Sequence, residues 1–194
     1  LTYFVVLFGA LCVGISAFAR ELIAVLSTPS FFGAAYAVGP LALSYVAYAS
    51  TQVTSLGITF KNRTYYFTIF SWLAAILNVV LNIIFIPQYG MLGTAWSTAV
   101  SYFFLTAGYF VVSQRLWRIT YETRRVLSAL ILTLVFTGAA PYLPSFGFTV
   151  DLLLKSGYCL AFFVLLTLFG VLDRREWSVA SNVMSRLRDK LTTP

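Results

Sequence analysis

The longest uncharged stretch of the chain most narrowly limits how it can fold. No Lys, Arg, Asp or Glu occurs between Arg63 and Arg115, a run of 51 residues. A helix rises about 1.5 Å per residue, so roughly 20 apolar residues cross about 30 Å of hydrocarbon, and this run has the length of two membrane crossings. We expect the turn between them at IPQYG, because Pro87 interrupts helical hydrogen bonding and Gly90 relaxes the backbone.

Uncharged windows elsewhere extend this interpretation to six transmembrane helices. The chain is 60% hydrophobic and only 10% charged, whereas soluble domains carry about 25% charged residues. The apolar runs are continuous, unlike the alternating strands of a β-barrel, and no segment has the wide polar face of a soluble helix. The sequence therefore predicts an all-α integral membrane protein over residues 1–172. The crossings are expected near 1–19, 38–60, 65–86, 91–112, 126–143 and 152–172.

The basic residues are distributed unevenly over the predicted connections. Thirteen Lys and Arg against six Asp and Glu give a net charge of +7. Eleven of the thirteen fall in the second connection, the fourth connection and the tail, and these three lie on the same side of the membrane. The positive-inside rule places that side, with both chain ends, in the cytoplasm and the turn at 87–90 outside. Membrane topology, rather than nucleic-acid binding, accounts for the basic excess.

The two ends of the chain give further expectations. The first crossing begins at residue 1 without an initiator Met, so we expect the chain to be the later part of a longer protein. Residues 173–194 form a basic cytoplasmic tail. Trp177, Met184 and Leu191 follow helical spacing there, which favours either an amphipathic helix on the membrane surface or a solvated tail.

Small and amide side chains flank the predicted turn. Gly93, Ser97 and Ser101 are spaced by four, and such small residues let helix backbones approach closely in lipid. Asn78 and Asn82 share one face of the preceding helix, where an amide is costly without a partner. We expect the two faces to meet in a packed helical hairpin. Direct contact with a substrate is the alternative.

The same passage resembles a known family of transporters. The matching residues are Asn78-Val79-Val80-Leu81-Asn82 and then Ile86-Pro87-Gln88-Tyr89-Gly90-Met91-Leu92-Gly93-Thr94-Ala95. They are similar to a passage of polysaccharide-export flippases, which resemble O-antigen flippases and belong to the superfamily of multidrug and toxin extruders. Thr94 stands where these proteins usually have a small apolar residue.

The resemblance implies an architecture and an activity. The six crossings would form most of the second, C-terminal lobe of a two-lobe flippase, whose cavity opens alternately to each side of the bacterial cytoplasmic membrane. It would move a lipid-linked oligosaccharide for surface polysaccharide synthesis without making or breaking covalent bonds and without a cofactor. The implied partners are membrane lipids, the lipid-linked glycan and other polysaccharide-assembly proteins.

The second crossing carries the most polar wall available to a substrate. Tyr45, Tyr48 and Gln52 lie along one helix face at intervals of three and four residues, as a wall facing a sugar would require. The alternative is that the hydroxyls of this crossing bond to carbonyls of their own helix while Gln52 pairs with a neighbouring helix.

Two cations are candidates for contact with an anionic, diphosphate-linked substrate. Lys155 lies within the last crossing, and an intramembrane charge is a functional candidate by default. Its structural interpretation is an i, i+4 pair with Asp151 near the outer surface. Arg20, beside Glu21, closes the first crossing and either meets the phosphate or anchors the membrane interface.

Three other function classes compete with a flippase. A membrane-embedded polymerase or acyltransferase would need general acids and bases, yet the chain has no His and its six acids lie near the membrane surfaces. A cation-coupled extruder would require a carboxylate deep in a crossing, and the long uncharged run contains none. A structural scaffold needs only packing motifs. No catalytic residue, metal ligand or nucleotide-binding motif is predicted.

Overall fold

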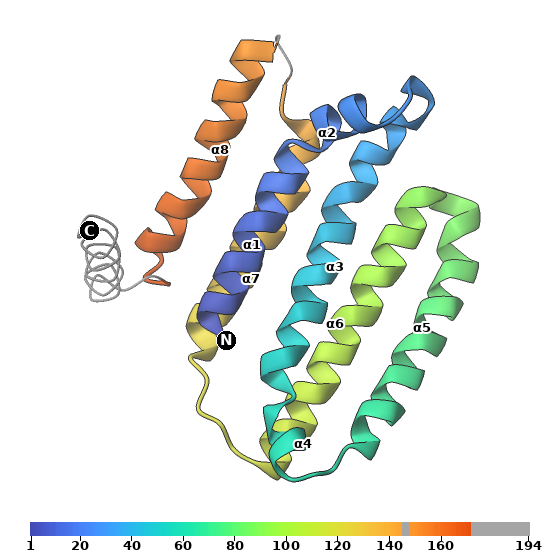
Figure 1. Cartoon of the computed structure of the whole chain (residues 1–194), viewed down its shortest axis with the longest axis vertical. Coiled ribbons are helices and arrows are strands. Elements are labelled where there is room, and N and C mark those ends of the chain that lie inside the picture. Colours follow the sequence, from blue (N-terminus) through green and yellow to red (C-terminus); the bar gives the residue numbers. More distant parts are fainter. Residues whose placement is uncertain (145–147, 172–194) are drawn as a thin grey trace, which may run out of the picture.

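The described part of the chain is built from helices. The computed structural model of the protein describes residues 1–144 and 148–171, and all regular structure in these residues is helical (Figure 1). The predicted tail at 173–194 lies outside the described residues. The elements are α1 (Thr2–Ala17), α2 (Ala19–Leu26), η1 (Pro29–Ala34), α3 (Ala35–Thr54), α4 (Leu56–Phe60), α5 (Tyr65–Tyr89), α6 (Met91–Leu116), α7 (Thr123–Ala139), η2 (Ala140–Tyr142) and α8 (Phe148–Leu168).

The lengths and composition of these helices indicate a membrane protein. Among the described residues, five helical segments are long and apolar enough to cross a membrane, and the count is six when the bent pair of α1 and α2 forms one span. The prediction of an all-α chain with apolar helices of membrane-spanning length is confirmed.

The predicted first crossing is not a single straight helix. α1 ends at Ala17, and α2 continues from Ala19 at an angle of 62°. The bend follows the end of the first uncharged window, where Arg20 and Glu21 enter the sequence. Both side chains bond to other helices, so they hold α2 across the end of the bundle.

The turn between α5 and α6 contains fewer residues than the sequence predicted. The break was expected over Pro87 to Gly90, but α5 continues through Pro87 to Tyr89 and α6 begins at Met91. Pro87 lies in the last turn of α5, where its missing N–H costs only one helical hydrogen bond. Gly90 alone makes the turn, with φ +54°, a conformation that residues with a Cβ seldom adopt.

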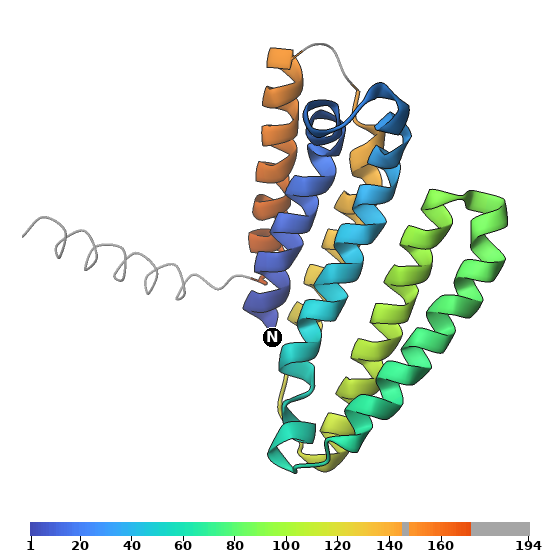
Figure 2. The same ribbon diagram turned by 45° about the vertical axis from the view of Figure 1, so that its right-hand side comes forward.

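The bundle consists of two groups of helices with α3 between them. α5 and α6 form a hairpin packed on α3, and α1, α7 and α8 form the other group (Figures 1 and 2). One core cluster, which includes Val5, Ala129 and Phe162, joins α1, α7 and α8. A smaller cluster, with Cys12, Leu43 and Val46, joins α1 to α3.

The two ends of the bundle differ in charge. α4 and the connections at 61–64 and 117–122 lie together at one end, which we call the basic end (Figure 1). The Gly90 turn, α2 and η1 lie at the opposite end. The alternation of helix direction thus gathers the basic connections on one side, as the predicted topology requires.

Candidate functional site

A polar groove lies between α3, α5 and α6, within the membrane-spanning part of the bundle. Its volume is about 400 Å³. Tyr48 of α3, Asn78 of α5 and Ser101 of α6 all line it, so residues predicted for substrate contact and residues predicted for helix packing share one cavity. The remaining lining residues are Ser71, Ala74, Ala75, Thr98, Tyr102 and Leu105.

The predicted polar wall of α3 is exposed along its length. Tyr45 is 59% exposed and Tyr48 45% exposed, and Gln52 is exposed one turn further on. Leu43 and Val46, on the other side of the helix, are buried. Tyr48 also packs against Tyr102 of α6, with ring centroids 5.0 Å apart. α3 therefore presents an aromatic surface at its middle and an amide in its last turn, and it buries its aliphatic side.

The smaller hydroxyls of α3 do not belong to this surface. They donate to carbonyls of their own helix at 2.6–3.1 Å, which confirms the structural alternative for these residues. The bonds run from Ser44 to Leu41, from Ser50 to Val46, from Thr51 to Tyr48 and from Thr54 to Ser50. The polar residues left exposed on α3 are Tyr45, Tyr48 and Gln52, together with Tyr36 in its first turn.

In the hairpin, the two asparagines of α5 and the small residues of α6 make other contacts than those predicted. Asn82 Nδ2 donates to Asn78 Oδ1 at 2.9 Å, so the two amides pair along α5, and Asn82 Oδ1 is buried without a partner. Ser97 and Ser101 donate to carbonyls within α6 at 2.8 Å. The close contact comes from Gly93, where a Cβ would lie 2.5 Å from the carbonyl oxygen of Phe85.

A second polar cluster lies at the end opposite to the basic end. Lys155 is 4% exposed and forms an ion pair with Glu21 of α2, a partner that the sequence analysis did not identify. Its Nζ also lies 5.9 Å from the centre of the Phe18 ring. Lys155 is thus engaged in a buried contact between helices, beyond the i, i+4 relation to Asp151 that the sequence indicated.

Arg20 joins three elements at this end of the bundle. Its Nη2 donates to the Pro141 carbonyl at 2.9 Å and to the Tyr36 hydroxyl at 3.3 Å, and its guanidinium lies 5.7 Å from the Tyr36 ring centre. Arg20 and Glu21 line a pocket of about 490 Å³ beside η1. Of the predicted substrate-path residues, only Tyr48 lines the polar groove. Tyr45 and Gln52 are exposed on the same helix outside it, and Arg20 and Lys155 lie at the opposite end from the basic connections.

Ser71 and Tyr102 line the polar groove but were missed by the sequence analysis. Ser71 precedes Asn78 by seven residues and therefore shares its helix face. Its hydroxyl lies 3.0 Å from that of Tyr109. Tyr102 follows Thr98 by four residues, on the same face of α6. Helical spacing could have identified both residues from the sequence, but each lies among apolar residues, so neither was selected.

The residue types along the groove set the chemistry it can support. All nine lining residues are uncharged, with hydroxyl, amide and aromatic groups among them. Within residues 1–144 and 148–171, no three His, Cys, Asp or Glu gather as a metal site would require. Comparison with protein-family models, with curated proteins and with solved structures gave no match.

Proposed function

We propose that the protein translocates a lipid-linked oligosaccharide across the membrane by alternating access, as most of the second lobe of a two-lobe flippase. The observation that carries this proposal is the exposure of Tyr45 and Tyr48 at the middle of a membrane-spanning helix, with Gln52 exposed on the same face in its last turn. A polar group without a partner in hydrocarbon is costly, so polar side chains along such a helix face protein or a water-filled cavity. A wall of this kind is what a sugar head group needs in order to cross.

The chemistry of the polar groove also supports a sugar ligand. Hydroxyl and amide groups both donate and accept hydrogen bonds, as sugar hydroxyls do, and aromatic rings offer flat apolar surfaces. Tyr48 and Tyr102 supply such rings and Asn78 supplies an amide, whereas Ser71 is bonded to Tyr109 and Ser101 donates to the Ser97 carbonyl. General acid–base catalysis would instead require a His or a positioned carboxylate beside the substrate. The groove is better suited to holding a neutral glycan than to altering its bonds.

The proposal includes an orientation, with the basic end in the cytoplasm of a bacterial cell. Cys introduced at Gln88, next to the Gly90 turn, should react with an impermeant thiol reagent added outside. Cys introduced at Arg118, at the basic end, should be protected until the membrane is permeabilised. Both variants need a background without Cys12 and Cys159. The reverse labelling pattern would contradict the orientation.

The transport proposal predicts a change in sidedness, with no change in product. In cells carrying Tyr48→Ala or Gln52→Ala in the intact protein, a lipid-linked oligosaccharide should accumulate on the cytoplasmic leaflet. Loss of one hydrogen bond or ring contact is worth about 1 kcal/mol, so each variant should slow translocation roughly five-fold and the double variant more. An impermeant reagent that modifies glycans measures the fraction on each leaflet.

Ile83→Ala is the matched control, because this side chain is 69% exposed on α5 and does not line the groove. It should leave translocation and protein level unchanged. A normal distribution of the glycan between leaflets, combined with a shortened or altered glycan in the α3 variants, would contradict the transporter proposal and support a membrane-embedded enzyme. Sensitivity to drugs, with glycan transport intact, would instead support an extruder.

A further inference from the structure

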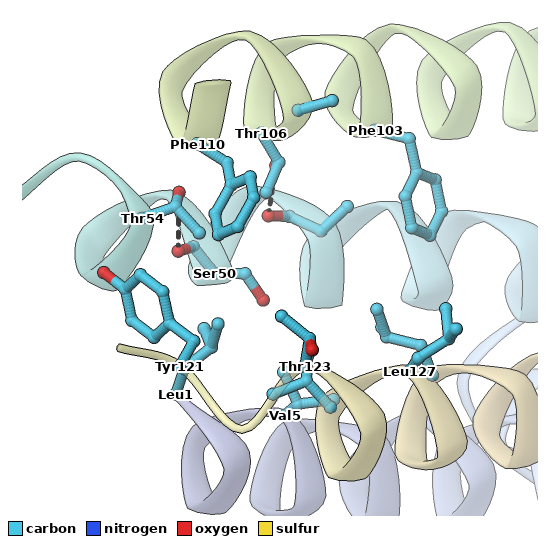
Figure 3. Close-up of a pocket in the computed structure, with 14 residues that line it drawn as sticks. Leu1, Val5, Ser50, Thr54, Phe103, Thr106, Phe110, Tyr121, Thr123 and Leu127 are labelled. Carbon is cyan, nitrogen blue, oxygen red and sulfur yellow. Dashed lines mark hydrogen bonds between the residues drawn. The ribbon is translucent and has the colours of Figure 1, made fainter. Parts of the chain in front are cut away.

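An apolar cleft separates the two helix groups near the basic end. It lies between α1, α3, α6 and α7 and has a volume of about 320 Å³. Its lining side chains come from four helices and the connection before α7, and they converge on one space (Figure 3). Aliphatic and aromatic residues form most of the wall, among them Val5, Phe103, Phe110, Leu127 and Leu130.

Four of the five hydroxyl side chains in the wall of the apolar cleft donate to backbone carbonyls, and the fifth, Thr123, is exposed at the start of α7. Thr106 donates to the Ala47 carbonyl at 2.7 Å, which ties α6 to α3, and Thr54 donates to the Ser50 carbonyl at 3.1 Å (Figure 3). Ser50 donates to Val46 at 2.8 Å. The hydroxyl protons of these residues are already used in bonds to the backbone, so the cleft suits a hydrocarbon chain better than a sugar.

The connection between α6 and α7 borders the cleft at the basic end. The Tyr121 hydroxyl donates to the Val53 carbonyl at 3.0 Å, and its ring lies 5.7 Å from the Phe110 ring. Burial raises the pKa of the Tyr121 hydroxyl, which keeps its proton for this bond. These contacts hold the connection against α3 and α6 beside the cleft.

The connection and the first turn of α7 bring positive charge to the basic end of the apolar cleft. Residues 118–125 contain three Arg and one Glu. Thr123 lines the cleft, and the next residue, Arg124, is exposed. Arg125 pairs with Glu122 at 3.1 Å, so that pair contributes little net charge. Basic pockets between helices on the cytoplasmic side of membrane proteins bind anionic lipid headgroups.

We propose that the apolar cleft binds a hydrocarbon chain of an anionic phospholipid, with the lipid phosphate beside Arg124 and Arg118. A lipid chain gains little hydrophobic energy by leaving other lipid, so the cleft retains the chain by shape and the Arg residues select the headgroup by charge. The occupant is a bilayer phospholipid because Ala47, Ser50 and Thr54 line the cleft from the side of α3 opposite to Tyr45, Tyr48 and Gln52. The site is thus separate from the proposed glycan path and does not depend on it.

Thermal unfolding of the purified, delipidated intact protein tests this site. Phosphatidylglycerol should raise the unfolding temperature, and phosphatidylcholine with the same chains should not. Ala107→Trp places a large ring in the cleft and should abolish the effect. Arg124→Gln should weaken the apparent affinity for phosphatidylglycerol about five-fold, since a basic residue near an anionic lipid surface is worth about 1 kcal/mol.

Two control variants match these substitutions. Ala161→Trp makes the same change at an exposed site on α8, and Arg63→Gln removes a charge from the other connection at the basic end. Both should keep the wild-type response to phosphatidylglycerol.

Equal responses to the two phospholipids, or equal affinities of the Arg124 and Arg63 variants, would overturn the proposal. Displacement of phosphatidylglycerol by an equimolar polyprenyl phosphate would also overturn it and assign the cleft to the substrate tail. If Ala107→Trp fails to fold, the comparison of the two Arg variants still decides the matter.

Discussion

Gly93→Ala is expected to cost the folded protein about 3 kcal/mol and to lower its abundance in the membrane. A Cβ at this position would lie 2.5 Å from the carbonyl oxygen of Phe85, 2.7 Å from its carbonyl carbon and 3.1 Å from the nitrogen of Ile86. All three are backbone atoms of α5, so no side-chain rotation relieves the contact. Overpacking typically costs about 1–3 kcal/mol, and a backbone clash belongs at the upper end. Thermal unfolding in detergent measures the loss.

Gly157→Ala is the matched control for this prediction. It makes the same chemical change in the middle of α8, where a Cβ would meet nothing within 4 Å. Alanine is favoured over glycine in a helix by about 1 kcal/mol, so this variant should be as stable as the wild type or slightly more stable. Equal destabilisation by the two variants would show that helix flexibility, and not the approach of α5 to α6, is what Gly93 provides.

The long helices were predictable because each follows directly from local sequence. An uncharged apolar run in a membrane must satisfy its backbone internally, and a helix does so within one segment. The run between Arg63 and Arg115 became α5 and α6, with their bounds shifted by only a few residues. Pro87 misled the prediction of the turn, since a proline in the last helical turn removes one bond without ending the helix.

The contacts between distant helices were less predictable. Glu21 and Lys155 are 134 residues apart, and the sequence offered the nearer Asp151 as the partner of Lys155. Helical spacing identifies residues that share a face, but it does not say which helix that face meets. The exposed face of Tyr45, Tyr48 and Gln52 was found by spacing alone, whereas its junction with Asn78 and Tyr102 needed the packing of α3 on the hairpin.

Lys155→Ala is expected to destabilise the protein by about 3 kcal/mol. Lys155 is 4% exposed, and its removal would leave the Glu21 carboxylate without its cation. Breaking a buried ion pair from one side costs about 3–5 kcal/mol, and the lower figure applies because the Glu21 side chain is 33% exposed. Lys61→Ala is the control, since this exposed lysine only stacks on Trp117 at 5.1 Å and should lose less than about 1 kcal/mol.

A double substitution separates the charge of Lys155 from its volume. Lys155→Met with Glu21→Leu removes both charges and keeps most of the side-chain volume, so no carboxylate is left unpaired. Replacing a buried pair by apolar residues is often neutral or stabilising, and the double variant should recover most of the stability lost in Lys155→Ala. Because neither Lys155 nor Glu21 lines the polar groove, the distribution of the glycan between the two leaflets should return to that of the wild type when stability is restored. A double variant that folds as well as the wild type but leaves the glycan on the cytoplasmic leaflet would assign the ion pair a direct part in transport.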